Sequence, residues 1–287
     1  MITVPVGWAG SLWNSRWIGG MKLMSVKGTI SEIKIRLEQD EEVSDAFLEA
    51  LQTDSRVGVR KLATSYIKKR EARQREVERV DRMWQLERAC RRQGYQAIAG
   101  VDEAGRGPLA GPVVAAAVIL PLEFDATGLN DSKKLSAEER ESLRVRIERD
   151  AVALGIGVVD HQYIDEYNIL QATYEAMRRA VAELSPVADC LLLDAVEVPE
   201  LLLPQHSIIK GDALSHSIAA ASVIAKTVRD RWMTEAGEKY PQYGFGKNMG
   251  YGTPDHLAAL ERWGACPIHR KSFAPVRERD DSTRNLA

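Results

Sequence analysis

Short apolar runs alternate with helical segments from Gln96 onward, and this alternation constrains the fold more than any other feature of the chain. Apolar runs bounded by turn residues are typical of buried strands, whereas apolar residues spaced three and four apart mark one face of a helix. Strands and helices that follow one another in this way build an α/β domain. The expected strands are Ala97–Val101, Val113–Leu120, Ala153–Val159, Cys190–Leu193 and His206–Ile209.

Helices are expected between and after these strands. A capping-box pattern begins one helix at Ser136, and a second helix covers about Ile169–Leu184. An alanine-rich helix follows Asp212, and its small residues would let it approach the sheet closely. The last helix is marked by Thr253 as its cap and by Gly264 beyond its end.

The region before Gln96 has many charged and few apolar residues, which predicts a small all-helical appendage. Thr29 begins a first helix, Ser44 caps a second, and Val59–Arg92 indicates a longer third. Residues 1–20 match no folding pattern, so Met21 or Met24 is the expected functional start. The expected divisions are residues 1–24, disordered or outside the functional start; 25–93, a helical accessory domain; 94–276, the main α/β domain with C-terminal helices; and 277–287, a disordered tail.

Charge is distributed unevenly along the chain. The formal net charge is only -2, which excludes a uniformly basic surface for nucleic acid. From Arg56 to Arg92, however, 13 Lys or Arg stand against 5 Asp or Glu. This stretch either grips phosphate or forms a solvated charged helix, and composition alone leaves both open.

Neither the cysteines nor the histidines show the spacing of a metal site. Cys90, Cys190 and Cys266 lie far apart, so neither a disulfide framework nor a zinc knuckle is indicated, and a reducing cytoplasmic setting follows. No run approaches the ~18 apolar residues of a membrane span. His269 follows Pro267 near the C-terminus, where we expect it to anchor the terminal segment rather than act as a general base.

Three acidic residues lie where strands are expected to end. Asp102 and Asp194 each close a predicted strand, and Asp212 lies between a strand and a helix. Strand ends of an open α/β sheet converge on one crevice, and oxygen-only ligation suits Mg²⁺ or Mn²⁺. Two such ions can activate a water and stabilise the departing oxygen of a phosphodiester. The alternative is that Asp194 and Asp212 are only helix caps or turn formers.

Glu103 raises a geometric difficulty. Neighbouring residues on a regular strand point to opposite faces, so Asp102 and Glu103 reach the same ions only if the strand breaks, for which Ala104-Gly105 is the candidate. Otherwise Glu103 contributes its backbone carbonyl, or approaches when substrate binds. The glycine-rich turn that follows lacks both Gly-x-Gly-x-x-Gly spacing and a P-loop ending.

The stretch Asp102-Glu103-Ala104-Gly105-Arg106-Gly107-Pro108 resembles the signature of type 2 ribonucleases H, specifically ribonuclease HII. The resemblance spans roughly Gln96 to Val276. Further similar segments follow in order: Asp131 to Leu135, Ile164-Asp165 with Asn168-Ile169, Asp194, Lys210 to Asp212, Ala219 to Ser222 with Ala225-Lys226 and Arg229-Asp230, Gly250 to Thr253, and His269 to Phe273.

This resemblance implies a ribonuclease H-like mixed sheet flanked by helices. It also implies endonucleolytic cleavage of RNA in RNA/DNA hybrids, including cleavage 5′ of single ribonucleotides in duplex DNA, as in ribonucleotide excision repair. The implied cofactor is Mn²⁺ or Mg²⁺. The implied site residues are Asp102, Glu103, Asp194 and Asp212 as the catalytic metal-binding set; Gly105, Arg106 and Gly107 around the ribose 2′-hydroxyl; Tyr251 against the neighbouring sugar; and Lys133 and Lys226 as phosphate or structural contacts.

Several alternatives remain at this stage. The related ribonuclease HIII typically has lysine where Arg106 stands and a different N-terminal domain, which favours HII. A DNA resolvase or integrase-like nuclease, and a hybrid-binding module without catalysis, are the other readings of the same residues. The expected partner is an RNA/DNA hybrid or ribonucleotide-containing duplex DNA, bound by a monomer away from membranes; a replication clamp is a further candidate partner.

Overall fold

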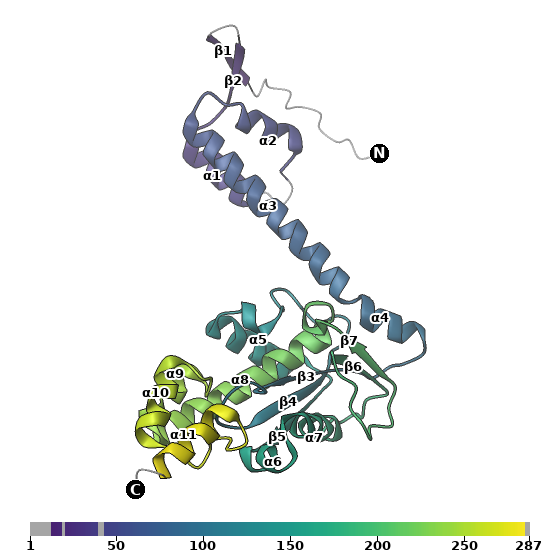
Figure 1. Cartoon of the computed structure of the whole chain (residues 1–287). Helices are drawn as coiled ribbons and strands as arrows, with labels where there is room; N and C mark the ends of the chain where they lie inside the picture. Colours follow the sequence, from purple (N-terminus) through teal and green to yellow (C-terminus); the bar gives the residue numbers. More distant parts are fainter. Residues whose placement is uncertain (1–12, 19–20, 40–42, 285–287) are drawn as a thin grey trace. The chain divides into compact units, whose positions relative to one another are not determined.

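The computed structural model describes residues 13–18, 21–39 and 43–284, with the side chains of 26–39 and 43–279 (Figure 1). The chain divides into two compact units, Met1–Glu78 and Arg79–Ala287. The division falls inside helix α3 (Val57–Met83), earlier than the expected boundary after residue 93. The reason is that Met83 and Trp84 already pack into the core of the second unit.

The N-terminal unit contains helices around a small apolar core. Helix α1 (Ile30–Gln39) starts at the predicted Thr29 capping box, and α2 (Asp45–Gln52) is capped by Ser44, both as predicted. An antiparallel hairpin of β1 (Trp13–Ile18) and β2 (Met21–Val26) precedes them, where the sequence predicted residues 1–24 to be disordered or outside the functional start. Residues 1–12 lie outside the described part of the chain.

The predicted third helix is divided in two. Helix α3 ends at Met83, and α4 (Gln85–Arg92) begins after Trp84. Trp84 is buried, and its ring lies 4.8 Å from that of His216. Charge periodicity along the sequence does not reveal this contact, which draws the chain into the core of the second unit.

The second unit is built on a mixed five-stranded sheet with the order β5-β4-β3-β6-β7. The central β3 runs antiparallel to β4 and parallel to β6, and this mixed arrangement confirms the predicted fold class. The strand bounds agree closely with the sequence-based expectations. They are β3 (Ile98–Ala104), β4 (Val113–Ile119), β5 (Ala153–Val159), β6 (Cys190–Asp194) and β7 (Gln205–Ile208).

Helices cover both faces of this sheet (Figure 1). Helix α7 (Ile169–Ala182) packs on one face, and the alanine-rich α8 (His216–Lys239) packs on the other. A Cβ at Gly100 would lie 2.0 Å from the backbone of Ser217, so the predicted close approach of α8 to the sheet depends on glycine at this position. The remaining helices of this half are α5 (Ala137–Asp150) and α6 (His161–Tyr167).

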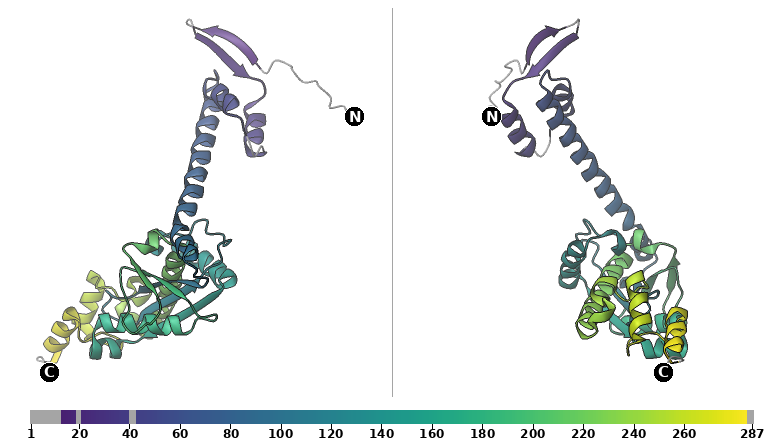
Figure 2. Two further views of the ribbon diagram at one scale, coloured as in Figure 1. Left: turned by 90° about the vertical axis from the view of Figure 1, so that its right-hand side faces the viewer. Right: turned by 60° about the vertical axis from the view of Figure 1, so that its left-hand side comes forward.

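Short helices follow the C-terminal end of α8 (Figure 2). They are α9 (Phe245–Asn248), α10 (Pro254–Trp263) and α11 (Ala274–Arg284). Helix α11 extends through Arg284, where the sequence predicted a disordered tail from residue 277. Buried Val276 anchors its first turn. In the part of the chain that the structure describes, no helix combines the length and apolar character needed to cross a lipid bilayer.

Candidate active site

Adjacent strands bring the predicted carboxylates together. Val101 of β3 pairs with Leu193 of β6 in parallel register, so the next residues, Asp102 and Asp194, lie side by side at the ends of the two strands. Asp194 Oδ1 accepts a hydrogen bond of 2.7 Å from the backbone N–H of Gly211, the residue before Asp212. The three aspartates therefore meet at one edge of the sheet, as the sequence predicted.

The electrostatics of this edge are strongly negative. Burial raises the pKa of Asp102 well above its usual range, and the carboxylates of Glu103 and Asp194 raise it further. Burial also raises the pKa of Asp212, with additional effects from Asp131 and Asp194. Clustered, partly desolvated carboxylates of this kind repel one another unless a cation lies among them, and their oxygens are the ligands that hard divalent cations prefer.

Glu103 is electrostatically coupled to the same carboxylates, although on a regular strand its side chain and that of Asp102 point to opposite faces of the sheet. β3 remains regular through Ala104, so the break falls after that residue rather than between the two acids. Burial raises the pKa of Glu103, whereas the guanidinium of Arg106, 3.5 Å from its carboxylate, lowers it. Asp194 also raises the pKa of Glu103, which means that the two negative charges repel each other.

The glycine-rich turn after β3 is held in a backbone conformation that requires glycine. Gly105 has φ +101°, and a Cβ there would lie 2.1 Å from Nε of Arg229. Gly107 lies beside the ring of Tyr251, which would be 3.7 Å from an added Cβ. The N–H of Leu109 donates a 2.7 Å hydrogen bond to the carbonyl of Gly250, which joins the turn to the Tyr251 segment.

A cleft of about 260 Å³ lies beside the carboxylates. It combines predicted acidic, glycine, cationic and aromatic residues from segments far apart in the sequence. Its lining includes Glu103, Gly105, Arg106, Gly107, Lys133, Lys226 and Tyr251, together with Ala104, Ser132, Ser222 and Arg229.

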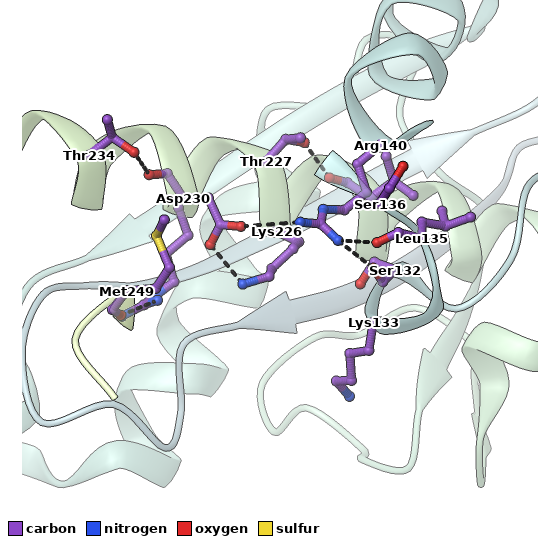
Figure 3. Close-up of polar contacts among 12 residues, drawn as sticks. Ser132, Lys133, Leu135, Ser136, Arg140, Lys226, Thr227, Asp230, Thr234 and Met249 are labelled. Carbon is purple, nitrogen blue, oxygen red and sulfur yellow. Dashed lines mark hydrogen bonds and ion pairs between the residues drawn. The ribbon is translucent and has the colours of Figure 1, made fainter. Parts of the chain in front are cut away.

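Lys226 is held at the wall of this cleft by a charged network (Figure 3). Its ammonium group lies 2.7 Å from Asp230, and Arg140 approaches the same carboxylate at 3.8 Å. Arg140 also donates hydrogen bonds to the carbonyls of Ser132 and Leu135, next to Lys133. Lys133 itself is exposed and acts electrostatically on Glu103 and Asp212. The network therefore holds the turn that presents Lys133.

Two buried arginines support the glycine-rich turn, and the sequence reasoning assigned neither of them a role. Arg229 donates to the carbonyls of Ala110, Pro112 and Met249, and Arg270 donates to those of Gly105, Arg106, Gly111 and Pro112. Their exposed fractions are 1% and 0%. Within the described residues neither forms an ion pair with a carboxylate, and burial lowers the pKa of Arg229 to about 10 and that of Arg270 to about 9. The sequence signal for them is that both lie in segments that resemble the family, Arg229-Asp230 and His269 to Phe273.

Helix α4 supports the turn that carries Asp212. The buried carboxylate of Glu87 accepts hydrogen bonds from the Ser215 hydroxyl, at 2.6 Å, and from the Ser217 N–H, at 3.0 Å. Ser215 caps α8, and its own N–H donates to the carbonyl of Gly211 at 2.8 Å. Burial raises the pKa of Glu87, and the hydrogen bonds from Ser215 and Ser217 oppose that rise; through Ser215 they join α4 to the turn that carries Asp212.

His269 is a structural residue, as the sequence predicted. It is fully buried, its Nε2 lies 3.0 Å from Nε2 of His256, and its Nδ1 accepts a hydrogen bond from the backbone N–H of Cys266. Burial, with a further contribution from His256, lowers the pKa of His269 to about 3. A histidine held neutral in this way anchors the C-terminal segment.

Acid should therefore destabilise the protein through His269. The unfolded chain binds a proton on this residue below pH ~6.5, whereas the folded chain does not until about pH 3, so stability falls as the pH is lowered through this window. We expect the free energy of unfolding to lose about 2 kcal/mol from this residue between pH 7 and pH 5. Denaturant titrations at several pH values measure the slope, and an equally steep slope in a His269→Gln variant would contradict the assignment.

Comparisons with known proteins match most of the chain. The family model described as Ribonuclease HII matches residues 99–276, and the one described as Ribonuclease HII N-terminal domain matches residues 29–91. Ribonuclease HII of Geobacillus thermodenitrificans is 52% identical over 250 residues, covering 87% of this chain and 96% of that protein. Ribonuclease HII of Ruminiclostridium cellulolyticum is 50% identical over 248 residues, covering 86% and 97%.

Solved structures show the same fold. The crystal structure of ribonuclease H2 from Pyrococcus horikoshii superposes with a TM-score of 0.56 at 26% identity, covering 66% of this chain and 99% of that one. The ribonuclease HII in the PCNA:RNase HII complex from Archaeoglobus fulgidus gives 0.53 at 26% identity, covering 62% and 95%. Together with the sequence matches over most of the chain, these findings show that the chain belongs to the ribonuclease HII family of endoribonucleases.

Proposed function

We propose that this endoribonuclease hydrolyses the RNA strand of RNA/DNA hybrids and cuts on the 5′ side of single ribonucleotides embedded in duplex DNA. The products would carry a 3′-hydroxyl and a 5′-phosphate. The observation that carries the proposal is the meeting of Asp102, Asp194 and Asp212 at one sheet edge, beside a cleft lined by the glycine-rich turn and Tyr251. This arrangement supports a substrate phosphate next to the carboxylates and a sugar against the turn.

Asp102, Glu103, Asp194 and Asp212 are the residues that would hold divalent cations, Mn²⁺ or Mg²⁺. Their oxygen donors, and the raised pKa values of Asp102, Glu103 and Asp212, fit such ions. When bound, two ions supply an activated water and stabilise the departing 3′ oxygen. No side chain has to act as the nucleophile, because water does. The carboxylates would fix where the attacked phosphate lies.

The turn Gly105-Arg106-Gly107 would recognise the ribose. The absence of side chains at the two glycines permits close approach of the substrate backbone, and the 2′-hydroxyl is the group that separates RNA from DNA. Tyr251, 45% exposed and adjacent to Gly107, can pack against the neighbouring sugar. Lys133 is exposed and free to contact a phosphate. Lys226 is paired with Asp230, so its main role would be to hold the wall of the cleft in place.

The accessory region, residues 25–93, would add grip on the nucleic acid. The first half of α3 carries Arg60, Lys61, Lys68, Lys69 and Arg70 without an acidic residue among them. A purely structural role for this helix is the alternative. We further propose that the protein acts as a cytoplasmic monomer; a replication clamp is a candidate partner because the Archaeoglobus relative was solved with PCNA.

One assay tests the proposed substrate. A labelled DNA duplex with a single ribonucleotide, an all-DNA duplex and a long RNA/DNA hybrid are each incubated while Mn²⁺ or Mg²⁺ is titrated. We expect cleavage of the first and third substrates, 5′ of the ribonucleotide in the first, and only when a divalent cation is present. Equal cutting of the all-DNA duplex would indicate a DNA-directed nuclease, and binding without cleavage at any ion concentration would indicate a hybrid-binding module.

A further inference from the structure

Two cysteines and a histidine that are far apart in the sequence meet at the opposite end of β6 from Asp194. Cys90 lies on α4, Cys190 begins β6, and His206 lies on the edge strand β7, three elements that can be followed in Figure 1. The two Sγ atoms are 3.8 Å apart. A ring nitrogen of His206 completes a group in which all three donor atoms lie within 4.8 Å of one another.

The distance between the two sulfurs matches the ligand spacing of a tetrahedral metal ion. With metal–sulfur bonds of about 2.3 Å, two sulfurs at tetrahedral positions lie ~3.8 Å apart, and a sulfur and an imidazole nitrogen lie ~3.6 Å apart. The sulfur pair already has this separation, and the nitrogen of the exposed His206 lies within 4.8 Å of both sulfurs, so it has to move closer when an ion binds. We propose that Cys90, Cys190 and His206 bind a thiophilic divalent cation, with Zn²⁺ as the best fit.

The donor set separates this site from the carboxylate centre. Two thiolates and an imidazole favour zinc, whereas the aspartates offer only the hard oxygen donors that suit Mg²⁺ and Mn²⁺. The two sites therefore select different ions. His206 is exposed, so a water can occupy the fourth position, and a chelator can reach the ion from this side.

The surroundings favour a cation once the thiols have lost their protons. Both thiols are buried, and burial raises the pKa of Cys190 to about 12 and also raises that of Cys90. Asp189 adds negative potential at both sulfurs. Its carboxylate accepts hydrogen bonds from the N–H groups of Gln96 and Ala97 at 2.7 and 3.0 Å, so it is engaged with the backbone rather than offered as a ligand. A bound cation would compensate this buried negative charge.

An ion at this site would join one helix to two strands. It would tie α4, which supports the Asp212 turn through Glu87, to β6, which ends on Asp194. We therefore expect zinc to raise the thermal midpoint of the full chain. The thermal midpoint is measured without an activity assay, so this test does not depend on the carboxylate centre.

Cobalt provides the direct test, because Co²⁺ bound by thiolates has an intense sulfur-to-metal charge-transfer band that Co²⁺ on carboxylates lacks. The reduced, chelator-treated full chain is titrated with Co²⁺, and Zn²⁺ is then added. We expect the band to appear and to be abolished by stoichiometric Zn²⁺. Cys90→Ser and Cys190→Ser should lose the band, and His206→Gln should weaken binding by more than about tenfold.

Cys266→Ser is the matched control, because Cys266 is also a buried free cysteine but lies outside the group. It should retain the wild-type band and affinity. Absence of the band in the folded, reduced wild-type protein would overturn the proposal, as would an unchanged band in Cys90→Ser and Cys190→Ser. If those two variants fail to fold by circular dichroism, the surface variant His206→Gln decides: wild-type affinity in it overturns the site.

Discussion

Replacing Asp102 with asparagine should abolish cleavage while leaving the fold intact. The amide keeps the shape of the side chain but removes one negative charge from the cluster with Glu103 and Asp194. Metal-assisted stabilisation of a transition state supplies several kcal/mol, and each 1.36 kcal/mol is a factor of ten in rate. We therefore expect kcat/KM on the embedded-ribonucleotide substrate to fall by at least about 10²- to 10³-fold.

The same substitution should not lower the stability of the metal-free protein. Burial raises the pKa of Asp102, which means that the ionised carboxylate is unfavourable in the fold, and asparagine removes that charge. Denaturant unfolding should give a free energy equal to or higher than wild type. Asp125→Asn is a matched control at an exposed position, where Asp125 pairs with Arg146 on the surface, and it should retain full activity. Substantial activity in the Asp102 variant would argue against the assignment of this carboxylate.

Replacing Arg270 with leucine should strongly destabilise the protein. The side chain donates to the carbonyls of Gly105, Arg106, Gly111 and Pro112, and leucine would leave these buried acceptors without that partner. Each unsatisfied buried group costs about 1–3 kcal/mol, part of which is offset because the buried, unpaired guanidinium is itself costly. We expect the free energy of unfolding to fall by about 3–5 kcal/mol, a large fraction of the stability of a typical domain.

Arg270→Lys separates the charge of this residue from its geometry. Lysine keeps a cation but cannot span the four carbonyls, so the glycine-rich turn should shift and kcat/KM should fall by ~10²-fold, with a smaller loss of stability than in the leucine variant. Arg277→Leu changes an exposed arginine on the following helix and should alter the free energy of unfolding by less than about 0.5 kcal/mol. Equal stability of the Arg270 and Arg277 leucine variants would contradict the supporting role.

The strands of the catalytic unit could be predicted because their runs of apolar residues indicate burial. β4 is apolar and buried at every position, and β5 was predicted with the bounds that the structure has. The N-terminal helices α1 and α2 were predicted from their caps, where a side chain satisfies backbone N–H groups locally. Each of these elements depends on interactions within a few residues of itself or on simple burial.

The elements that differed depend on contacts distant in sequence. The break between α3 and α4 follows from Trp84 packing beside His216, and the final helix α11 is anchored by Val276. The position of the break in β3 could not be deduced either, because the regular pairing of Ala104 with Val114 decides it. None of these contacts leaves a periodic signal in the sequence.

The sequence by itself determined the fold class, the family and the order of the acidic residues along the chain, because burial patterns and local motifs are properties of neighbouring residues. Only the tertiary structure decided which distant groups meet. Parallel pairing of β3 with β6 joins Asp102 to Asp194, and the packing of α4 brings Cys90 to Cys190 although their linear spacing indicated no metal site. The physical reason is that strand pairing and helix packing set distances between side chains independently of their separation along the chain.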